Sequence, residues 1–182
     1  MSWEFDVLYW FQSIHTPFLD KLVPLITALG DGGIFWIIVT LLILIFYKKD
    51  HRRMGCMMVL ALLLDFIICN LILKNAVARQ RPCWIDPTVE LLVKSPKDYS
   101  FPSGHSAFSL AAATSIFLNN KKWGSAALVL AALIALSRLY LFMHFPTDVI
   151  GGACVGIGCA LLSCLIIRQI WKKAGFTNTA VK

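Results

Sequence analysis

Long apolar runs separated by short charged segments limit what this chain can fold into more than any other feature of the sequence. Several runs are roughly 20 residues long, the length that a helix needs to cross the hydrocarbon core of a bilayer. The composition agrees, because 58% of the residues are hydrophobic and only 15% are charged. The main apolar runs are 34–47, 54–73, 102–118, 123–143 and 149–171. The pattern predicts an all-α fold, a polytopic membrane helix bundle.

Positive charge is concentrated between the apolar runs and at the C-terminus. Residues 48–53 and 119–122 form two short basic segments, and residues 172–182 form a basic tail. Short loops rich in Lys and Arg face the cytoplasm in most membrane proteins, so we expect both loops and the tail there. Topology therefore explains the net charge of +7, and nucleic acid is not expected as a partner.

The chain is expected to form a single integral-membrane domain over residues 1–182. Residues 1–16 are rich in aromatic side chains, roughly amphipathic and too short to span, so they predict a helix lying along the membrane interface. The helical bundle follows over residues 17–171, and residues 172–182 form the cytoplasmic tail.

The beginning of the bundle is interrupted by helix-breaking residues. Pro17, Pro24 and a Gly-Asp-Gly-Gly run at residues 30–33 punctuate an otherwise apolar segment. We expect a short or re-entrant helix, a turn, and then a first span whose start is capped by Asp31. With this segment, the expected number of transmembrane helices is five to six.

One polar stretch stands out against the apolar background, between the last two runs. Arg138, His144 and Asp148 lie there, and such residues are costly in or beside a membrane unless they are paired, so they indicate a functional site. A histidine followed by an aspartate has the arrangement of a base and the group that orients it. An arginine within reach supplies a planar fork suited to a phosphate.

Further polar residues are expected at the same membrane depth, on the side opposite the basic loops. They are Lys74, Arg81, Ser103 and His105. Together with the stretch above, they would form a site for a tetrahedral oxyanion, with three cations, two histidines and an aspartate. The convergence of separate stretches is a stronger signal than any one of them.

The residue types suggest how such a site works. The helix start at Ser103 and Gly104 offers unpaired backbone N–H groups at the positive end of a helix dipole. The cations would neutralise phosphate charge, while one histidine attacks phosphorus and the other protonates the leaving oxygen. His144 has the aspartate partner and is the better nucleophile, so His105 is then the acid. No cluster of Asp, Glu and His indicates a divalent metal, so neither a metal nor a cofactor is expected.

Three motifs carry a family resemblance. They are Lys74-x6-Arg81-Pro82, Pro102-Ser103-Gly104-His105 and Ser137-Arg138-x5-His144-x3-Asp148. In this order they resemble the three-part signature of the type-2 phosphatidic acid phosphatase and vanadium haloperoxidase superfamily, over about residues 22–171. The resemblance implies a small bacterial integral-membrane lipid phosphatase that works without metal through a phosphohistidine intermediate. It implies His144 as nucleophile, Asp148 as its orienter and His105 as acid/base. It also implies five phosphate ligands: Lys74, Arg81, Ser103, Gly104 and Arg138.

Other polar residues have plainer interpretations. Asp65 lies inside an apolar run and is expected to be protonated and hydrogen-bonded within the bundle, because helical spacing puts it opposite Lys74. Asp98 either positions the adjoining loop or lies on its surface. Three loop cations are expected in solvent or near lipid headgroups: Arg79, Lys94 and Lys97.

The predicted function is the dephosphorylation of a membrane lipid at the extracytoplasmic face of a bacterial plasma membrane, with the lipid tail remaining in the bilayer. The predicted substrate is undecaprenyl pyrophosphate, because the chain is small, the site faces outward and the loop cations could meet a second phosphate. Phosphatidylglycerophosphate or phosphatidic acid is the alternative. A non-hydrolytic lipid transporter or binding protein would not need the His–Asp pair, and haloperoxidase chemistry usually belongs to soluble proteins.

Overall fold

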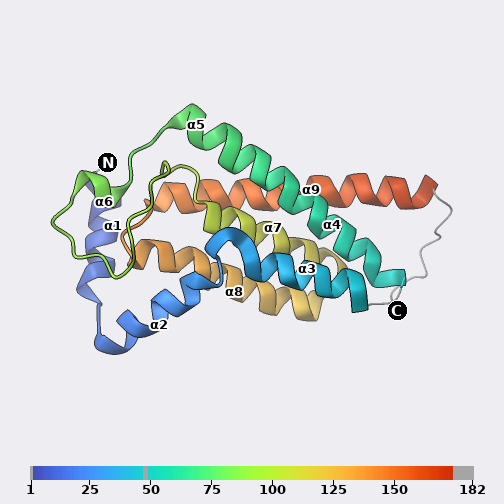
Figure 1. Ribbon diagram of the computed structural model, residues 1–182, viewed down its shortest axis with the longest axis horizontal. Coiled ribbons are helices and arrows are strands. Elements are labelled where there is room, and N and C mark those ends of the chain that lie inside the picture. Colours follow the sequence, from blue (N-terminus) through green and yellow to red (C-terminus); the bar gives the residue numbers. More distant parts are fainter. Residues whose placement is uncertain (1, 47–48, 174–182) are drawn as a thin grey trace.

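The computed structural model describes residues 2–46 and 49–173, and these residues form a bundle of helices without a β-strand (Figure 1). The elements are α1 (Ser2–Ser13), α2 (Pro17–Ala28), the 3₁₀ turn η1 (Asp31–Gly33), α3 (Ile34–Phe46), α4 (Lys49–Asp65), the π-helix η2 (Phe66–Leu73), α5 (Lys74–Val77), α6 (Pro82–Ile85), α7 (Gly104–Asn119), α8 (Lys121–Tyr140) and α9 (Pro146–Lys173). The all-α bundle predicted from the apolar runs is confirmed.

Helix α7 lies at the centre of the bundle, where it packs against α4, α8 and α9. Small residues allow these close approaches. A Cβ atom added to Gly152 would lie 2.4 Å from the carbonyl oxygen of Ser103, and one added to Gly156 would lie 2.1 Å from that of Ala107. The Gly-x-x-x-Gly pattern of α9 is therefore a helix-contact face against α7. This contact also fixes the start of α7 beside the start of α9.

Three of the described helical segments are long and apolar enough to cross a membrane: Arg52–Ile85, Lys121–Tyr140 and Pro146–Lys173. A fourth span results if α2 and the segment Asp31–Phe46, which meet at a bend of 42°, are counted as one broken span. Helix α7 has 16 residues, about 24 Å at the usual rise per residue, which is less than the hydrocarbon thickness. It is enclosed by the longer helices, as expected for a multi-pass membrane protein.

The two ends of the bundle differ in charge. Figure 1 shows that α3 and α9 end, and α4 and α8 begin, at the same end of the molecule. The basic residues of that end include Arg52, Arg53, Lys121, Lys122, Lys172 and Lys173. The common placement predicted for the two basic segments and the tail is therefore seen, although Lys48 and residues 174–182 lie outside the described residues.

Helix α1 lies across the opposite end of the bundle, near α6 and the starts of the long connection and of α9 (Figure 1). Its Leu8 is fully buried in an apolar cluster with Tyr140, Phe142 and Phe145, and Glu4 is also buried. The helix thus belongs to the packed structure. Its position at the membrane interface stays a prediction.

The π-helix η2 changes which residues of the second apolar run face inward. The backbone N–H of Lys74 bonds to the carbonyl oxygen of Cys69, five residues back, so each turn holds more residues than in an α-helix. Asp65, Cys69 and Lys74 are consequently all buried. The prediction that Asp65 and Lys74 lie on opposite faces, which assumed regular α-helical spacing, is wrong.

Asp65 itself also departs from expectation. Its side chain is fully buried, and neither carboxylate oxygen has a hydrogen-bond partner among the described residues. The hydrogen bonds predicted for it within the bundle are therefore not formed there.

Candidate functional site

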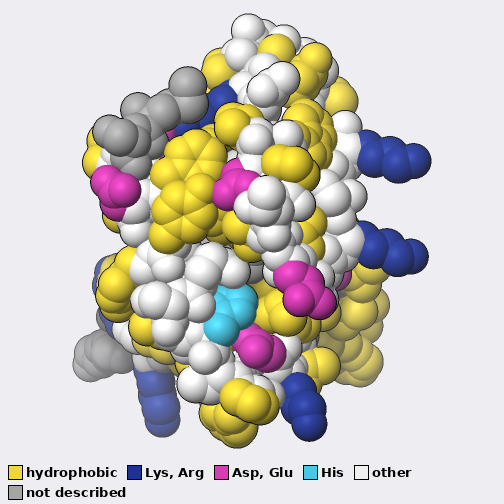
Figure 2. Space-filling view, turned by 90° about the vertical axis from the view of Figure 1, so that its left-hand side faces the viewer, with side chains coloured by type: hydrophobic (Ala, Val, Ile, Leu, Met, Phe, Trp, Pro, Cys, Tyr) yellow, Lys and Arg dark blue, Asp and Glu magenta, His cyan; other side chains and the backbone are white. Residues whose placement is uncertain are grey.

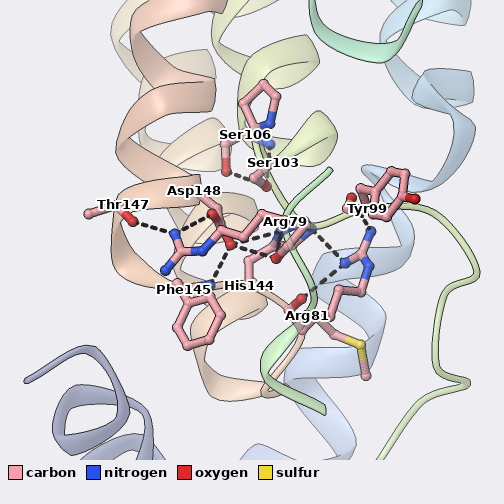
Figure 3. Close-up of polar contacts among 12 residues, drawn as sticks. Arg79, Arg81, Tyr99, Ser103, Ser106, His144, Phe145, Thr147 and Asp148 are labelled. Atoms are coloured by element: carbon pink, nitrogen blue, oxygen red, sulfur yellow. Dashed lines mark hydrogen bonds and ion pairs between the residues drawn. The ribbon is translucent and has the colours of Figure 1, made fainter. Parts of the chain in front are cut away.

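The proposed nucleophile His144 lies in the turn that joins α8 to α9, and it is buried (Figure 3). Its Nε2 atom is 2.9 Å from Nη1 of Arg81. Because a guanidinium only donates hydrogen bonds, Nε2 must be the acceptor, which leaves the ring proton on Nδ1. Nε2 is therefore unprotonated and keeps its lone pair, which is the form that a nucleophile needs.

Asp148 supports His144 through an intervening hydroxyl group. The distance from His144 Nδ1 to Asp148 Oδ2 is 3.7 Å, which is too long for a hydrogen bond. Ser100 lies between them, with its Oγ 2.5 Å from Asp148 Oδ2 and 3.4 Å from His144 Nδ1. The backbone N–H of Phe145 donates to the same carboxylate oxygen over 2.8 Å. The hydroxyl can thus accept from the imidazole while it donates to the carboxylate.

Arg79 holds the other side of the Asp148 carboxylate (Figure 3). Its Nη1 donates to Asp148 Oδ1 over 2.8 Å and to Thr147 Oγ1 over 2.6 Å, and its Nη2 donates to Glu4 Oε2 over 2.6 Å. The guanidinium also lies 4.1 Å from the centre of the Phe145 ring. The prediction that Arg79 faces solvent or headgroups is wrong, because two buried carboxylates draw it inward.

A cavity of about 270 Å³ opens in front of His144. It is lined by Gly30, Gly32, Gly33, Phe66, Asn70, Lys74, Arg81, Pro96, Asp98, Gly104, His105, Phe108, Arg138 and His144. Six of the eight predicted site residues are in this lining, from α5, the following loop, α7, α8 and the turn between α8 and α9. The structure therefore brings together the cations and both histidines of the three motifs. Figure 2 views this end of the molecule, where acidic side chains and a histidine reach the surface among hydrophobic ones.

The other two predicted residues, Ser103 and Asp148, lie behind the cavity wall. Ser103 caps α7: its Oγ accepts from the backbone N–H of Ser106 over 3.4 Å and from the Ser106 hydroxyl over 2.9 Å. Its own N–H donates to the backbone oxygen of Asp148 over 2.9 Å. Gly104 does line the cavity, and a Cβ there would lie 3.3 Å from Asn70 Oδ1. The start of α7 is thereby kept open towards the cations.

Arg138 brings a buried positive charge to the cavity. Its Nη1 donates to Thr27 Oγ1 on α2 over 2.7 Å. Its Nε is buried and has no hydrogen-bond partner among the described residues. A buried guanidinium with unused donors is costly unless an anion completes it. The lining of the cavity therefore fits a phosphate group.

Asp98 connects two of the cations at the mouth of the cavity. Its carboxylate forms an ion pair with Lys74, and its Oδ1 accepts from Arg81 Nη2 over 2.9 Å. Partial burial acts to raise the pKa of Asp98, but the hydrogen bond from Lys74 and the charge of Arg81 outweigh it and lower the pKa to about 2. The carboxylate thus stays ionised and contacts the groups that would bind a phosphate. Both interpretations left open for Asp98 are seen in part: its side chain is 52% exposed at the loop surface, and its contacts with Lys74 and Arg81 hold the loop against the site.

His105 lies at the first turn of α7 and pairs with an acidic residue of η1. Its Nε2 is 2.8 Å from Asp31 Oδ1. The helical segment at η1 has Gly30 as its N-terminal flanking residue, without a side-chain cap. The prediction that Asp31 caps the first span is therefore wrong, because its carboxylate is directed to His105. Within the part of the chain that the structure describes, no group of three or more His, Cys, Asp or Glu side chains could hold a metal ion.

Several supporting residues were not found from the sequence. Ser100, Glu4 and Thr27 lie far along the chain from the groups they contact, and no motif marks them. Asp31 carried a usable signal, since an acidic residue between glycines in an apolar segment is expensive. The spacing Arg79-x-Arg81 was a second usable signal, because both arginines belong to the same short loop.

The fold and site together define a helical membrane protein with two histidines around a cationic cavity. Residues 53–172 match the PAP2 superfamily, which is about two thirds of the chain. The chain therefore belongs to the PAP2 superfamily, and the family predicted from the three motifs is confirmed.

Relatives and a solved structure agree with this assignment. The chain is 36% identical over 130 residues to an undecaprenyl-diphosphatase of Sulfolobus acidocaldarius, covering 70% of this chain and 61% of the relative. It is 32% identical to a lipid A 4'-phosphatase of Bacteroides thetaiotaomicron, covering 83% of this chain and 71% of the relative. The crystal structure of a PAP2-type phosphatidylglycerolphosphate phosphatase from Bacillus subtilis superposes with a TM-score of 0.72 at 27% identity, over 94% of this chain and 86% of that structure. These proteins are all named as phosphatases of lipids, but of three different ones.

Proposed function

We propose that this chain hydrolyses a membrane lipid phosphate or pyrophosphate through a phosphohistidine intermediate on His144. The observation that carries the proposal is the unprotonated Nε2 of His144 at the wall of a cavity lined by Lys74, Arg81 and Arg138. Cations of this kind stabilise the charge that develops on a transferred phosphoryl group. A protein that only bound or carried the lipid would need them, but not the oriented histidine.

The reaction has two balanced steps. In the first, His144 Nε2 bonds to phosphorus as the bond from phosphorus to the lipid oxygen breaks, and His105 gives that oxygen a proton. In the second, water attacks phosphorus, the phosphorus–nitrogen bond breaks, and the proton of the water passes to His105. The products are inorganic phosphate and the lipid with one phosphate fewer, and both histidines return to their first state. Lys74, Arg81, Arg138 and the N–H group of Gly104 are the proposed phosphate ligands.

Arg81 has a double role in this scheme. Before substrate enters, its Nη1 donates to His144 Nε2 and to the backbone oxygen of Met143. When phosphorus approaches Nε2, the same guanidinium lies beside the phosphate oxygens and can donate to them instead. The nucleophile is thereby kept unprotonated until the phosphate arrives.

Undecaprenyl pyrophosphate is the proposed substrate, with conversion to undecaprenyl phosphate. The relative from Sulfolobus acidocaldarius carries the corresponding name, and this similarity supports the proposal. The loop cations give less support than expected: Arg79 is bound to Glu4 and Asp148, and Lys94 and Lys97 are exposed. Phosphatidylglycerophosphate remains the second candidate, because the superposed structure from Bacillus subtilis is named for it.

The site is proposed to face the extracytoplasmic side of a bacterial plasma membrane. The cavity lies at the end of the bundle opposite the basic ends of α4, α8 and α9, and basic ends are retained in the cytoplasm. A phosphate could then enter from the outer headgroup region while the lipid tail stays in the bilayer. Hydrolysis by sealed, right-side-out vesicles of a non-permeant lipid added outside tests this placement.

A competition assay tests the reaction and the substrate together. Purified protein in mixed micelles receives equal amounts of undecaprenyl pyrophosphate, phosphatidylglycerophosphate and phosphatidic acid, and kcat/KM is measured for each with and without EDTA. We expect the pyrophosphate to be preferred, with no loss to the chelator and with inhibition by vanadate. If a glycerophospholipid wins by tenfold, about 1.4 kcal/mol of transition-state preference, the substrate is wrong and the reaction stands. Absence of phosphate release from all three lipids would refute the reaction itself.

A further inference from the structure

The proposed acid His105 is held by a carboxylate that lies outside the three motifs. Asp31 Oδ1 is 2.8 Å from His105 Nε2. Asp31 comes from η1, at the bend between α2 and α3, 74 residues before the histidine. The side chain of His105 is 20% exposed and that of Asp31 is 65% exposed, so the pair lies at the open side of the site.

The backbone around Asp31 is shaped to come close to the start of α7. A Cβ atom on Gly30 would lie 2.5 Å from Cδ2 of His105, and one on Gly33 would lie 2.3 Å from Cε1 of Phe108. Gly32 and Gly33 also have positive φ angles of 58° and 67°, which other residues rarely adopt. Glycine on both sides of Asp31 therefore allows the bend to bring its carboxylate to His105.

The hydrogen bond divides the work of the two imidazole nitrogens. A carboxylate accepts, so the proton on Nε2 is directed to Asp31. This leaves Nδ1 as the nitrogen that can exchange a proton with the substrate. A negative charge at this position also stabilises a positively charged imidazole against the three cations of the same cavity, Lys74, Arg81 and Arg138. Asp98, which also lines the cavity, is already bound to two of these cations.

Building on the proposed phosphatase function, we propose that Asp31 is the positioning residue of the acid His105, and that it directs His105 Nδ1 to the leaving oxygen of the lipid. As the bond from phosphorus to the lipid oxygen breaks, the Nδ1 proton passes to that oxygen, and the imidazole becomes neutral while its Nε2–H stays on Asp31. In the second step, Nδ1 takes back a proton from the attacking water. Asp31 itself touches no reacting atom.

The dependence of the rate on the leaving group distinguishes this role from a structural one. The lipid substrate of this test is a phosphate monoester such as phosphatidic acid. Its alkoxide is a poor leaving group and needs the proton, whereas a p-nitrophenolate leaves without it. We expect Asp31→Asn, which keeps the shape but removes the charge, to lower kcat on the lipid substrate by about 10- to 100-fold. This is at or below the lower end of the roughly 10²- to 10⁴-fold that a general acid contributes, because the acid itself remains. On p-nitrophenyl phosphate the loss should be less than about threefold. KM should change little, because the cations of the cavity are intact.

Three comparisons complete the experiment. Asp6→Asn removes the same charge from an exposed residue of α1 and should match the unmodified protein. In the His105→Ala background, Asp31→Asn should cause no further loss. Asp31→Glu, with the charge restored on a longer side chain, should recover part of the lipid rate, and it carries the test if the Asn variant does not fold.

The outcomes separate the two proposals. An equal loss on lipid and aryl phosphate, or no loss on either, overturns the assignment of Asp31 while leaving the phosphatase intact. So does a further loss on the His105→Ala background. If the unmodified protein releases no phosphate from a lipid, or if His144→Ala retains its rate, the proposed function fails first.

Discussion

The two histidines of the site are held in opposite ways. His144 has a side chain that is 2% exposed, and its carboxylate Asp148 is fully buried. His105 is 20% exposed, and its carboxylate Asp31 faces solvent over most of its surface. A nucleophile must keep one lone pair aimed at phosphorus, whereas an acid must exchange protons with water in each turnover. The difference in burial matches the difference in proposed task.

The energetic consequences of changing the two carboxylates should differ as well. Asp148, Arg79 and Glu4 form a buried network of charges, and removing one partner of a buried pair leaves an uncompensated charge that costs about 3–5 kcal/mol. Asp31 and His105 form a partly exposed pair, and such pairs contribute about 0–1 kcal/mol. Substitutions around His144 should therefore affect folding and activity together, while those around His105 should affect activity alone.

The largest effect is expected at the buried histidine. His144→Ala should reduce turnover of every phosphate substrate by at least about 10⁴-fold, the scale seen when a catalytic nucleophile or base is removed. Vanadate binding should remain measurable, because Lys74, Arg81 and Arg138 are unchanged. Stopped assays on lipid and p-nitrophenyl phosphate, with vanadate binding by calorimetry, measure both.

His105→Ala is the matched variant for that measurement. It should lose activity mainly on a lipid monoester such as phosphatidic acid, since an aryl group leaves without a proton. Turnover of His144→Ala within a few-fold of the unmodified protein would remove the assignment of the nucleophile. If His105→Ala loses activity equally on both substrates, the proposed difference in role between the two histidines is wrong.

A smaller effect is expected at Glu4, the far end of the buried network. Glu4→Gln keeps the shape of the side chain but removes the charge that faces Arg79 and the acceptor of the Thr147 hydroxyl bond, at 2.6 Å each. We expect a loss of about 1–3 kcal/mol in stability, typical of a weakened buried polar contact, and a fall of about tenfold in kcat on lipid and aryl phosphate alike. Thermal unfolding in detergent and the two kinetic assays check this.

Glu90→Gln supplies the control, because Glu90 lies exposed in the long connection. It should change neither stability nor rate. If Glu4→Gln lowers the lipid rate but spares the aryl rate, Glu4 acts on the acid side of the site, and the separation of the two histidines is wrong.

Residue spacing in the sequence was enough to predict the relative positions of residues that are connected by regular helices. Alternating spans place Lys74, Arg81, His105 and Arg138 at one end of the bundle, and the structure gathers them around one cavity. The predictions failed where the backbone departs from regularity. The π-helix η2 brings Asp65 and Lys74 to the same buried side. Residue spacing calculated for an α-helix does not predict this common position.

Contacts between distant segments were also beyond reach of the sequence. Arg79 is bound by Glu4 and Asp148, which are 75 and 69 positions away in the sequence. Ser100 donates a hydrogen bond to Asp148, which is 48 positions away. Such partners depend on how α1 crosses the end of the bundle and how the long connection returns to α7. Neither follows from local spacing, so the supporting residues of the site were missed while those of the motifs were found.

The smallest effect is expected at Asp98, the carboxylate that lies between the two sides of the site. It is half-exposed and binds Lys74 and Arg81, so a phosphate must compete with it for both cations. Since its pKa is lowered to about 2, its contribution to stability is present above the unfolded pKa of about 4 and is lost only as the pH falls towards 2. The competition should therefore be constant between pH 5 and 9.

Asp98→Asn should strengthen vanadate binding by about three- to tenfold at each pH in that range, because the cations lose their internal partner. Its stability should change by less than about 1 kcal/mol, as for other exposed ion pairs. Inhibition constants measured at pH 5, 7 and 9 and thermal unfolding test both expectations. Weaker vanadate binding would mean that the main effect of Asp98 is to hold Lys74 and Arg81 in place for the phosphate. Its competition with the phosphate would then be the smaller effect. In that case the open side of the site, like the buried side, would depend on a carboxylate for its geometry.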